Sequence, residues 1–173
     1  MVKSFLNKIF LTTFIMLFFA PINAEENTKI NNHQYNLYIG NFDFSDDKQK
    51  ATLIGFQHQN ENLERKILLG NASPITGGFI TDNSAAYVYT GVEWNYSISE
   101  KLKFTPSFAP GIYHQGDGKD LGHALEFKTE IQASYTISEA TSFGMSYNHI
   151  SNASLGDKNP GANSYMFNIL KNF

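Results

Sequence analysis

The chain has 173 residues, with 13 basic and 16 acidic side chains and no cysteine. This length predicts one domain, and the lack of cysteine excludes disulfide frameworks and thiolate chemistry. The formal net charge of −3 argues against a nucleic-acid partner, because nucleic-acid binding requires a basic face.

The first element in the chain is a secretory signal peptide, predicted over residues 1–24. Lys3 and Lys8 form a positive start, the run 9–20 is nearly all apolar, and Ala24 ends a small-residue cleavage site. The alternative is an uncleaved anchor. Removal of the peptide leaves residues 25–173 with a net charge of about −5, since both lysines leave with it.

The rest of the chain divides into short segments that are separated by turn residues. None is an apolar run long enough to cross a membrane as a helix. Alternation without long apolar runs is typical of bacterial outer-membrane barrels, so we predict an all-β fold, an eight-stranded antiparallel transmembrane β-barrel. The predicted strands are 34–43, 50–59, 63–71 (with an irregular continuation to 80 as an alternative), 85–98, 102–114, 123–137, 141–151 and 163–173.

The segment 123–137 shows the alternation most clearly. One face is apolar apart from Thr129, whereas the other carries Glu126, Lys128, Glu130 and Gln132. Such charge is costly in an apolar core but natural inside a membrane barrel with a polar interior. We therefore expect the apolar face to contact lipid and the two glutamates to form an interior ion-pair network with Lys128.

The connections predict how the barrel is oriented. Those at 44–49, 115–122 and 152–162 are long and polar, and the one around 73–84 carries Gly and Pro. Those at 60–62, 99–101 and 138–140 are short. Long outer loops and short periplasmic turns are the usual asymmetry, and eight strands leave no wide pore.

Segment 141–151 carries the candidate chemistry. Phe143, Met145 and Tyr147 mark its lipid face, and His149 and Ser151 continue that face at the outer end. A histidine that can accept the hydroxyl proton is the usual way to activate a serine. The alternative, non-catalytic interpretation is that both are interfacial polar residues that end the lipid-facing belt.

The stretch HISNASLGDKNPGANSY (149–165) closely resembles the catalytic segment of the lipid A 3-O-deacylases, PagL-type outer-membrane barrels often labelled acyloxyacyl hydrolases. The resemblance extends through FTPSFAPGIYHQGDGKDLGHALEFKTEI (104–131) and YIGNFDFSDDKQKATLIGF (38–56). It implies a serine esterase in the outer membrane that removes an ester-linked 3-hydroxyacyl chain from lipid A, without a metal or organic cofactor.

The resemblance also implies roles for single residues. Ser151 matches the nucleophile and His149 the base, and Asn152 and Asn159 lie in the oxyanion-stabilising region. Where the characterised deacylases carry an acid, this chain has Asn163, which can orient the imidazole but supplies no charge. The activity would then be weaker, would rest on a dyad, or would borrow another acid such as Asp157.

Other sequence features give weaker indications of function. We interpret GDGKD (116–120) as a solvated turn because it lacks the ligand series of a calcium loop, and no histidine spacing predicts a metal site. Phe173 resembles the terminal aromatic by which the outer-membrane assembly machinery recognises barrels. The main rival function is a non-catalytic barrel with a structural or adhesive role, and phospholipid esters are an alternative substrate. The sequence does not determine the oligomeric state, and a homo-oligomer is one alternative.

Overall fold

The computed structural model describes residues 32–46 and 49–173, so the predicted signal peptide lies outside the described residues. Within this part of the chain, no helix is both long and apolar enough to span a membrane. The only described helical segment is the single turn η1 (Glu61–Leu63). The strands are β1 (His33–Phe42), β2 (Ala51–Asn60), β3 (Arg65–Ile67), β4 (Gly70–Thr81), β5 (Ala86–Trp94), β6 (Tyr96–Ser97), β7 (Leu102–His114), β8 (Leu125–Ser138), β9 (Thr141–Ser151) and β10 (Ala162–Asn172).

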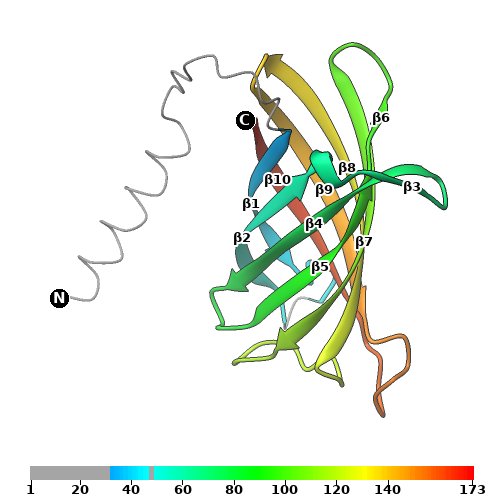
Figure 1. The fold of residues 1–173 in the computed structure, drawn as a ribbon. Helices are drawn as coiled ribbons and strands as arrows, with labels where there is room; N and C mark the ends of the chain where they lie inside the picture. Colours follow the sequence, from blue (N-terminus) through cyan, green and yellow to red (C-terminus); the bar gives the residue numbers. More distant parts are fainter. Residues whose placement is uncertain (1–31, 47–48) are drawn as a thin grey trace. The chain divides into compact units, whose positions relative to one another are not determined.

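The strands form a closed antiparallel barrel (Figure 1). Its order is β2-β1-β10-β9-β8-β7-β5-β4, and pairing of β2 with β4 closes the sheet. The short strand β6 continues the path of β5 along β7, and β3 pairs only with β4. The wall therefore has eight staves, that is, eight positions around the barrel, each filled by one strand or by two strands in line. The predicted eight-stranded barrel is confirmed.

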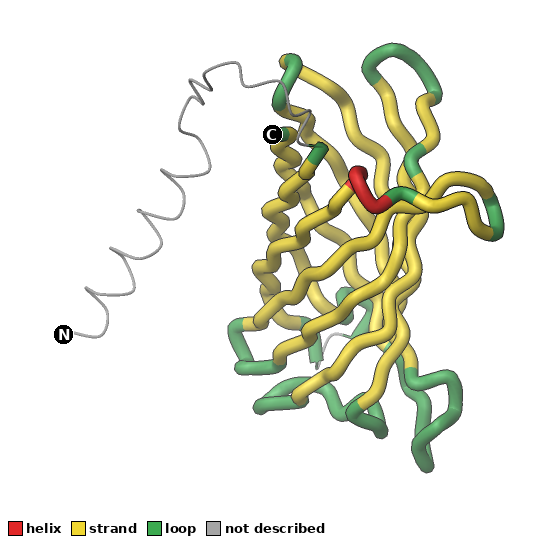
Figure 2. The backbone as a smooth tube through the Cα atoms, in the orientation of Figure 1, coloured by secondary structure: helices red, strands yellow, loops and turns green. Residues whose placement is uncertain are grey.

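Side chains alternate between the lumen and the outer wall, as the sequence pattern predicts. On β8, Glu126 and Lys128 are buried in the lumen, whereas Ile131 and Tyr135 are about half exposed on the outside. A closed barrel with apolar side chains on its outer wall and polar ones inside is the arrangement of membrane barrels. Figure 2 shows the strands as a continuous wall with most loops at its two ends and one hairpin arm, β3–β4, that projects from its side.

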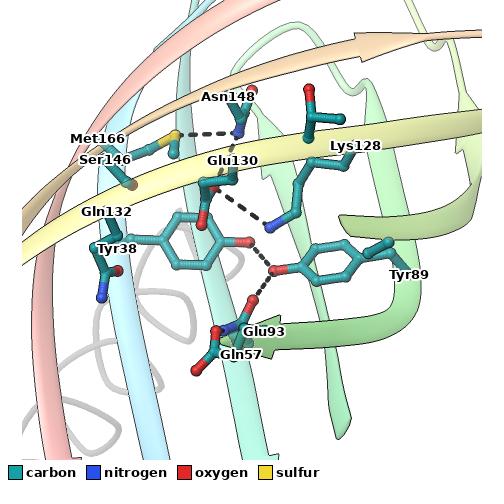
Figure 3. A network of polar contacts seen from close by, with 12 residues as sticks. Tyr38, Gln57, Tyr89, Glu93, Lys128, Glu130, Gln132, Ser146, Asn148 and Met166 are labelled. Atoms are coloured by element: carbon teal, nitrogen blue, oxygen red, sulfur yellow. Dashed lines mark hydrogen bonds and ion pairs between the residues drawn. The ribbon is translucent and has the colours of Figure 1, made fainter. Parts of the chain in front are cut away.

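Part of the lumen holds a polar network around one ion pair (Figure 3), beside a cluster of buried apolar side chains that includes Phe42, Leu53 and Phe79. Lys128 Nζ lies 3.3 Å from Glu130 Oε2 and 4.1 Å from the centre of the Tyr89 ring. The Tyr89 hydroxyl donates to Gln57 Oε1, and Gln57 Nε2 donates to Glu93 Oε2. A buried ion pair that is surrounded by donors and acceptors avoids most of the penalty of unpaired buried charge.

The predicted network is wrong in one member. Glu126 is fully buried, but neither of its carboxylate oxygens has a hydrogen-bond partner among the described residues. Lys128 pairs with Glu130 instead. Glu126 and Lys128 are two residues apart, but the lysine side chain extends towards Tyr89 and Glu130, which alternation alone does not predict.

The third stave also differs from the predicted one. β4 runs to Thr81, so the turn to β5 is short, and the longer connection is 61–69, which precedes β4. Pro74 is tolerated because it lies between the part of β4 that pairs with β3 and the part that pairs with β2. Gly77 leaves room for Tyr89, since a Cβ there would lie 2.7 Å from the tyrosine hydroxyl.

Candidate active site on the outer wall

His149 and Ser151 lie on the outer face at the end of β9, at the opposite end of the barrel from its first and last strand residues (Figure 1). Both are half-buried, while Ile150 between them is fully buried in the lumen. Phe143 and Met145 share their face lower on the strand and are about half exposed. The predicted outward orientation is therefore what the fold produces.

Asn163 meets His149 because the two residues are register partners on β10 and β9. The distance from His149 Nδ1 to Asn163 Oδ1 is 2.8 Å. An amide oxygen only accepts hydrogen bonds, so the proton of the neutral imidazole lies on Nδ1 and the Nε2 lone pair is free to act as a base. The sequence predicted that Asn163 was placed to reach the ring, and it does.

The Asn163 side chain is itself held from two sides. The Tyr147 hydroxyl donates to Asn163 Oδ1 at 2.8 Å, and Asn163 Nδ2 donates to Ser45 Oγ at 3.4 Å. The backbone N–H of Phe44 also donates to the Asn163 carbonyl. These contacts keep the amide oxygen directed at the imidazole. Sequence reasoning used Tyr147 only as a lipid-facing residue and did not identify Ser45.

Gly161 packs against the other edge of the imidazole. It has a φ of +61°, and a Cβ built on it would lie 2.8 Å from His149 Cε1 and 3.3 Å from Nε2. A side chain here would be strained by the backbone and would also push on the ring. The ring is thus confined between Asn163 and Gly161, a constraint that the sequence analysis missed although it noted the Asn-Pro-Gly sequence.

The loop 152–161 is tied down by Asn152, whose side chain is fully buried. Asn152 Nδ2 donates to the carbonyls of Leu121 and Lys158, and its backbone N–H donates to Asn159 Oδ1. The Asn152 side chain is therefore occupied in holding two loops together. Of the two asparagines predicted for the oxyanion region, only Asn159 has an amide nitrogen with no acceptor among the described residues.

Backbone conformation singles out the two residues that follow Asn152. Ala153 and Ser154 have φ values of +52° and +63°, an uncommon conformation for residues other than glycine. Neither N–H group donates a hydrogen bond within the described part of the chain. Consecutive free N–H groups in such a turn form a concavity that suits an anion, and sites of observed strain are often functional.

A second loop supports this one. Lys158 Nζ lies 2.7 Å from Asp120 Oδ2, and both side chains are about half exposed. The hydrogen bond from Lys158, with one from the Gly122 N–H, holds the pKa of the Asp120 carboxyl below its usual range. Gly156 also lies against Gly122, since a Cβ on Gly156 would be 2.3 Å from the Gly122 carbonyl oxygen.

Two expected contacts do not occur. Among the described residues, Ser151 Oγ makes no hydrogen bond to His149, and Asp157 makes neither a hydrogen bond nor an ion pair with it. Catalytic hydrogen bonds are often long in a free enzyme and shorten when substrate binds. In the same part of the chain, no group of three histidine or acidic side chains is arranged to hold a metal ion.

Comparisons with known proteins identify the family and the fold of the chain. The model of the family described as Lipid A 3-O-deacylase (PagL) matches residues 34–172. The crystal structure of the outer membrane enzyme PagL is similar with a TM-score of 0.62 and 15% identity, over 80% of this chain and 98% of that one. A de novo designed transmembrane β-barrel is similar with a TM-score of 0.59 and 10% identity, over 86% and 100%. No curated protein sequence matches the chain.

At these identities the solved structures establish the fold, and the family model adds the relationship. The predicted barrel and its location in the outer membrane are confirmed. The family model covers nearly every described residue, including the candidate site on β9 and β10. The chain belongs to the lipid A 3-O-deacylase (PagL) family.

Proposed function

We propose that the protein is a serine esterase that removes an ester-linked 3-hydroxyacyl chain from lipid A in the outer leaflet. The observation that carries the proposal is the contact between His149 Nδ1 and Asn163 Oδ1 at 2.8 Å on the lipid-facing wall. It leaves Nε2 as the basic nitrogen on the same face as Ser151. Family membership supports the choice of lipid A as substrate.

The reaction would begin with transfer of the Ser151 hydroxyl proton to His149 Nε2. Ser151 Oγ attacks the ester carbonyl carbon, and the negative charge that develops on the carbonyl oxygen requires donors. The free N–H groups of Ala153 and Ser154 and the Asn159 amide nitrogen are the nearest candidates along the chain. Collapse of this intermediate breaks the ester bond, and His149 returns the proton to the departing sugar oxygen.

Water then completes the cycle. His149 removes a proton from a water molecule, which attacks the acyl-serine and releases the fatty acid and free Ser151. Throughout, Asn163 holds the imidazole by accepting the Nδ1 proton but places no charge beside the imidazolium. We therefore expect a slower reaction than one with a carboxylate at this position.

Other assignments follow from the same proposal. The signal peptide 1–24 would direct export, and Phe173 would be read by the barrel-assembly machinery. Phe173 is about half exposed and packs edge-on against Tyr35 at 5.2 Å, so its ring remains accessible at the end of β10.

The test is mass spectrometry of lipid A from cells that express the wild type or Ser151→Ala. Loss of one 3-hydroxyacyl chain with the wild type alone is the expected result. Identical lipid A from both strains, with both proteins folded in the membrane, would instead support the rival function, a structural or adhesive barrel. Asn163 is the feature that favours this rival. Loss of a phospholipid acyl chain would replace lipid A as the substrate.

A further inference from the structure

The connection 61–69 forms a hairpin that leaves the barrel wall between β2 and β4. β3 pairs with the start of β4, and Figures 1 and 2 show this arm projecting sideways from the barrel. Its tip consists of Ile67, Leu68 and Leu69, which are 45%, 82% and 65% exposed. Single exposed apolar residues are ordinary, but the tip of a hairpin in water favours Gly, Asn or Asp.

The backbone of this tip is bonded by aromatic side chains from the wall. Trp94 Nε1 donates to the Leu68 carbonyl at 2.8 Å, and the Tyr96 hydroxyl donates to the Leu69 carbonyl at 2.6 Å. Trp94 follows the buried Glu93 and so has the outward register of β5, yet it is only 9% exposed. The tip therefore lies over the outer wall.

The level of the tip falls within the apolar band of that wall. Beyond Tyr96, towards the end of the barrel where β1 begins and β10 ends, the outer face is still apolar: Ile98 is 63% exposed, and Ile137 on β8 is 56% exposed. A segment at this depth meets hydrocarbon, where every backbone polar group must find a partner inside the protein. The bonds from Trp94 and Tyr96 satisfy the carbonyls of Leu68 and Leu69 from within the protein, which favours a position of the tip among acyl chains.

The conformation of Leu69 points the same way. Its φ is +72°, a conformation that disfavours a residue with a Cβ. Transfer of a leucine side chain from water into an apolar phase is favourable. Burial of Leu69 in lipid would therefore offset the strain, whereas exposure to water would not. Next to the tip, the exposed Lys66 has an apolar stem and a charged end, a combination that suits a position near headgroup phosphates.

We propose that the tip of the β3–β4 hairpin, Ile67–Leu69, is a lipid-binding surface that inserts among phospholipid acyl chains of the periplasmic leaflet. It is separate from the site on β9 and does not depend on the proposed esterase activity. Because it extends beyond the staves of the barrel, it adds a lateral contact with the bilayer at the end opposite His149 and Ser151.

The test uses the absence of native cysteine. Leu68→Cys carries a nitroxide label in full-length barrels reconstituted into dioleoylphosphatidylcholine vesicles. Collision rates with oxygen, which concentrates in lipid, are compared with those of a water-soluble nickel chelate. Ile131→Cys is the lipid reference, because its native side chain is about half exposed on the outer wall. Asp117→Cys is the water reference, because Asp117 is a charged, exposed residue in the loop between β7 and β8.

We expect the oxygen-to-nickel ratio of the Leu68 label to equal that of the Ile131 label. A ratio equal to that of the Asp117 label would overturn the proposal. Poor access to both reagents with spin–spin broadening would also overturn it, since the tip would then contact a second copy of the chain. Heat-modifiable gel mobility verifies folding of each variant, and Ile67→Cys serves in place of Leu68→Cys if that variant does not fold.

Discussion

Asn163→Asp should raise the kcat of the proposed deacylation. Aspartate has nearly the same shape as asparagine, so its carboxylate should still accept from His149 Nδ1 and from the Tyr147 hydroxyl, both now 2.8 Å from Oδ1. The Ser45 hydroxyl, which accepts from Asn163 at 3.4 Å, can rotate to donate instead. The substitution thus changes charge and leaves the geometry in place.

The size of the gain follows from the distance. Unit charges about 4 Å apart attract by about 4 kcal/mol at an effective dielectric constant of 20. His149 and Asn163 are both half-buried, so solvent screens part of this energy, and we retain about 1.4–2 kcal/mol for the imidazolium that forms in the transition state. This corresponds to a gain of roughly tenfold to thirtyfold in kcat.

The assay is release of 3-hydroxy fatty acid from purified lipid A by the barrel in detergent micelles. Asn172→Asp is the matched control, because it adds the same charge on β10 at the opposite end of the barrel and should leave kcat unchanged. Asn163→Leu removes the acceptor and should lower kcat. Equal kcat for the wild type, Asn163→Asp and Asn163→Leu would refute the assignment of Asn163 as the residue that orients His149.

Three further predictions concern the surroundings of the site. Gly161→Ala should lower kcat, because the new Cβ would lie 2.8 Å from His149 Cε1 and displace the ring. The expected loss is about 100-fold, the scale for displacement of a catalytic group by about 1 Å. An unchanged kcat in the folded variant would contradict the confinement of the ring. Lys128→Met should lower the free energy of unfolding in urea by about 3–5 kcal/mol, because it leaves Glu130 buried without its counter-ion. The double variant Lys128→Met/Glu130→Gln should recover most of this loss. Equal unfolding free energies for the wild type and Lys128→Met would show that the ion pair contributes nothing. The pKa of Asp120 is lowered in the folded protein, so its ion pair with Lys158 should stabilise the loops above about pH 4 and be lost as the pH falls further. The measurement is the protease resistance of the loop 152–161 at about pH 7 and about pH 3, in the wild type and in Asp120→Asn. The same pH response in both proteins would contradict the prediction.

The strands that the sequence predicted best are those in which local alternation is unbroken. β7 and β9 begin and end at the predicted residues, because apolar and polar positions alternate along most of their length; Ile150, which faces the lumen, is an exception on β9. β4 was mispredicted because Pro74 and Gly77 are turn formers by local preference. Their place in a strand depends on pairing gaps and on Tyr89 from the neighbouring stave, and a single sequence does not show either.

The candidate site divides in the same way. The common face of His149 and Ser151 follows from a period of two, so it was predictable. The contact of His149 with Asn163 requires the register between β9 and β10, which is set over the whole length of both strands. The inward orientation of Asn152 also follows from alternation, since it is the next position after the outward Ser151. The prediction of an oxyanion role for Asn152 rested on the family resemblance and did not consider which face the residue occupies.

The two ends of the barrel show how this architecture separates stability from chemistry. At the end with His149, two loops meet through Asn152, and the strained residues Ala153 and Ser154 leave their N–H groups without an acceptor among the described residues. At the opposite end, the carbonyls of the hairpin tip are bonded by Trp94 and Tyr96. Acyl chains offer no partner for a backbone carbonyl, whereas a charge that forms in a reaction requires donors that are not already engaged. The free N–H groups after Ser151 are therefore suited to a position that an ester carbonyl or water can reach.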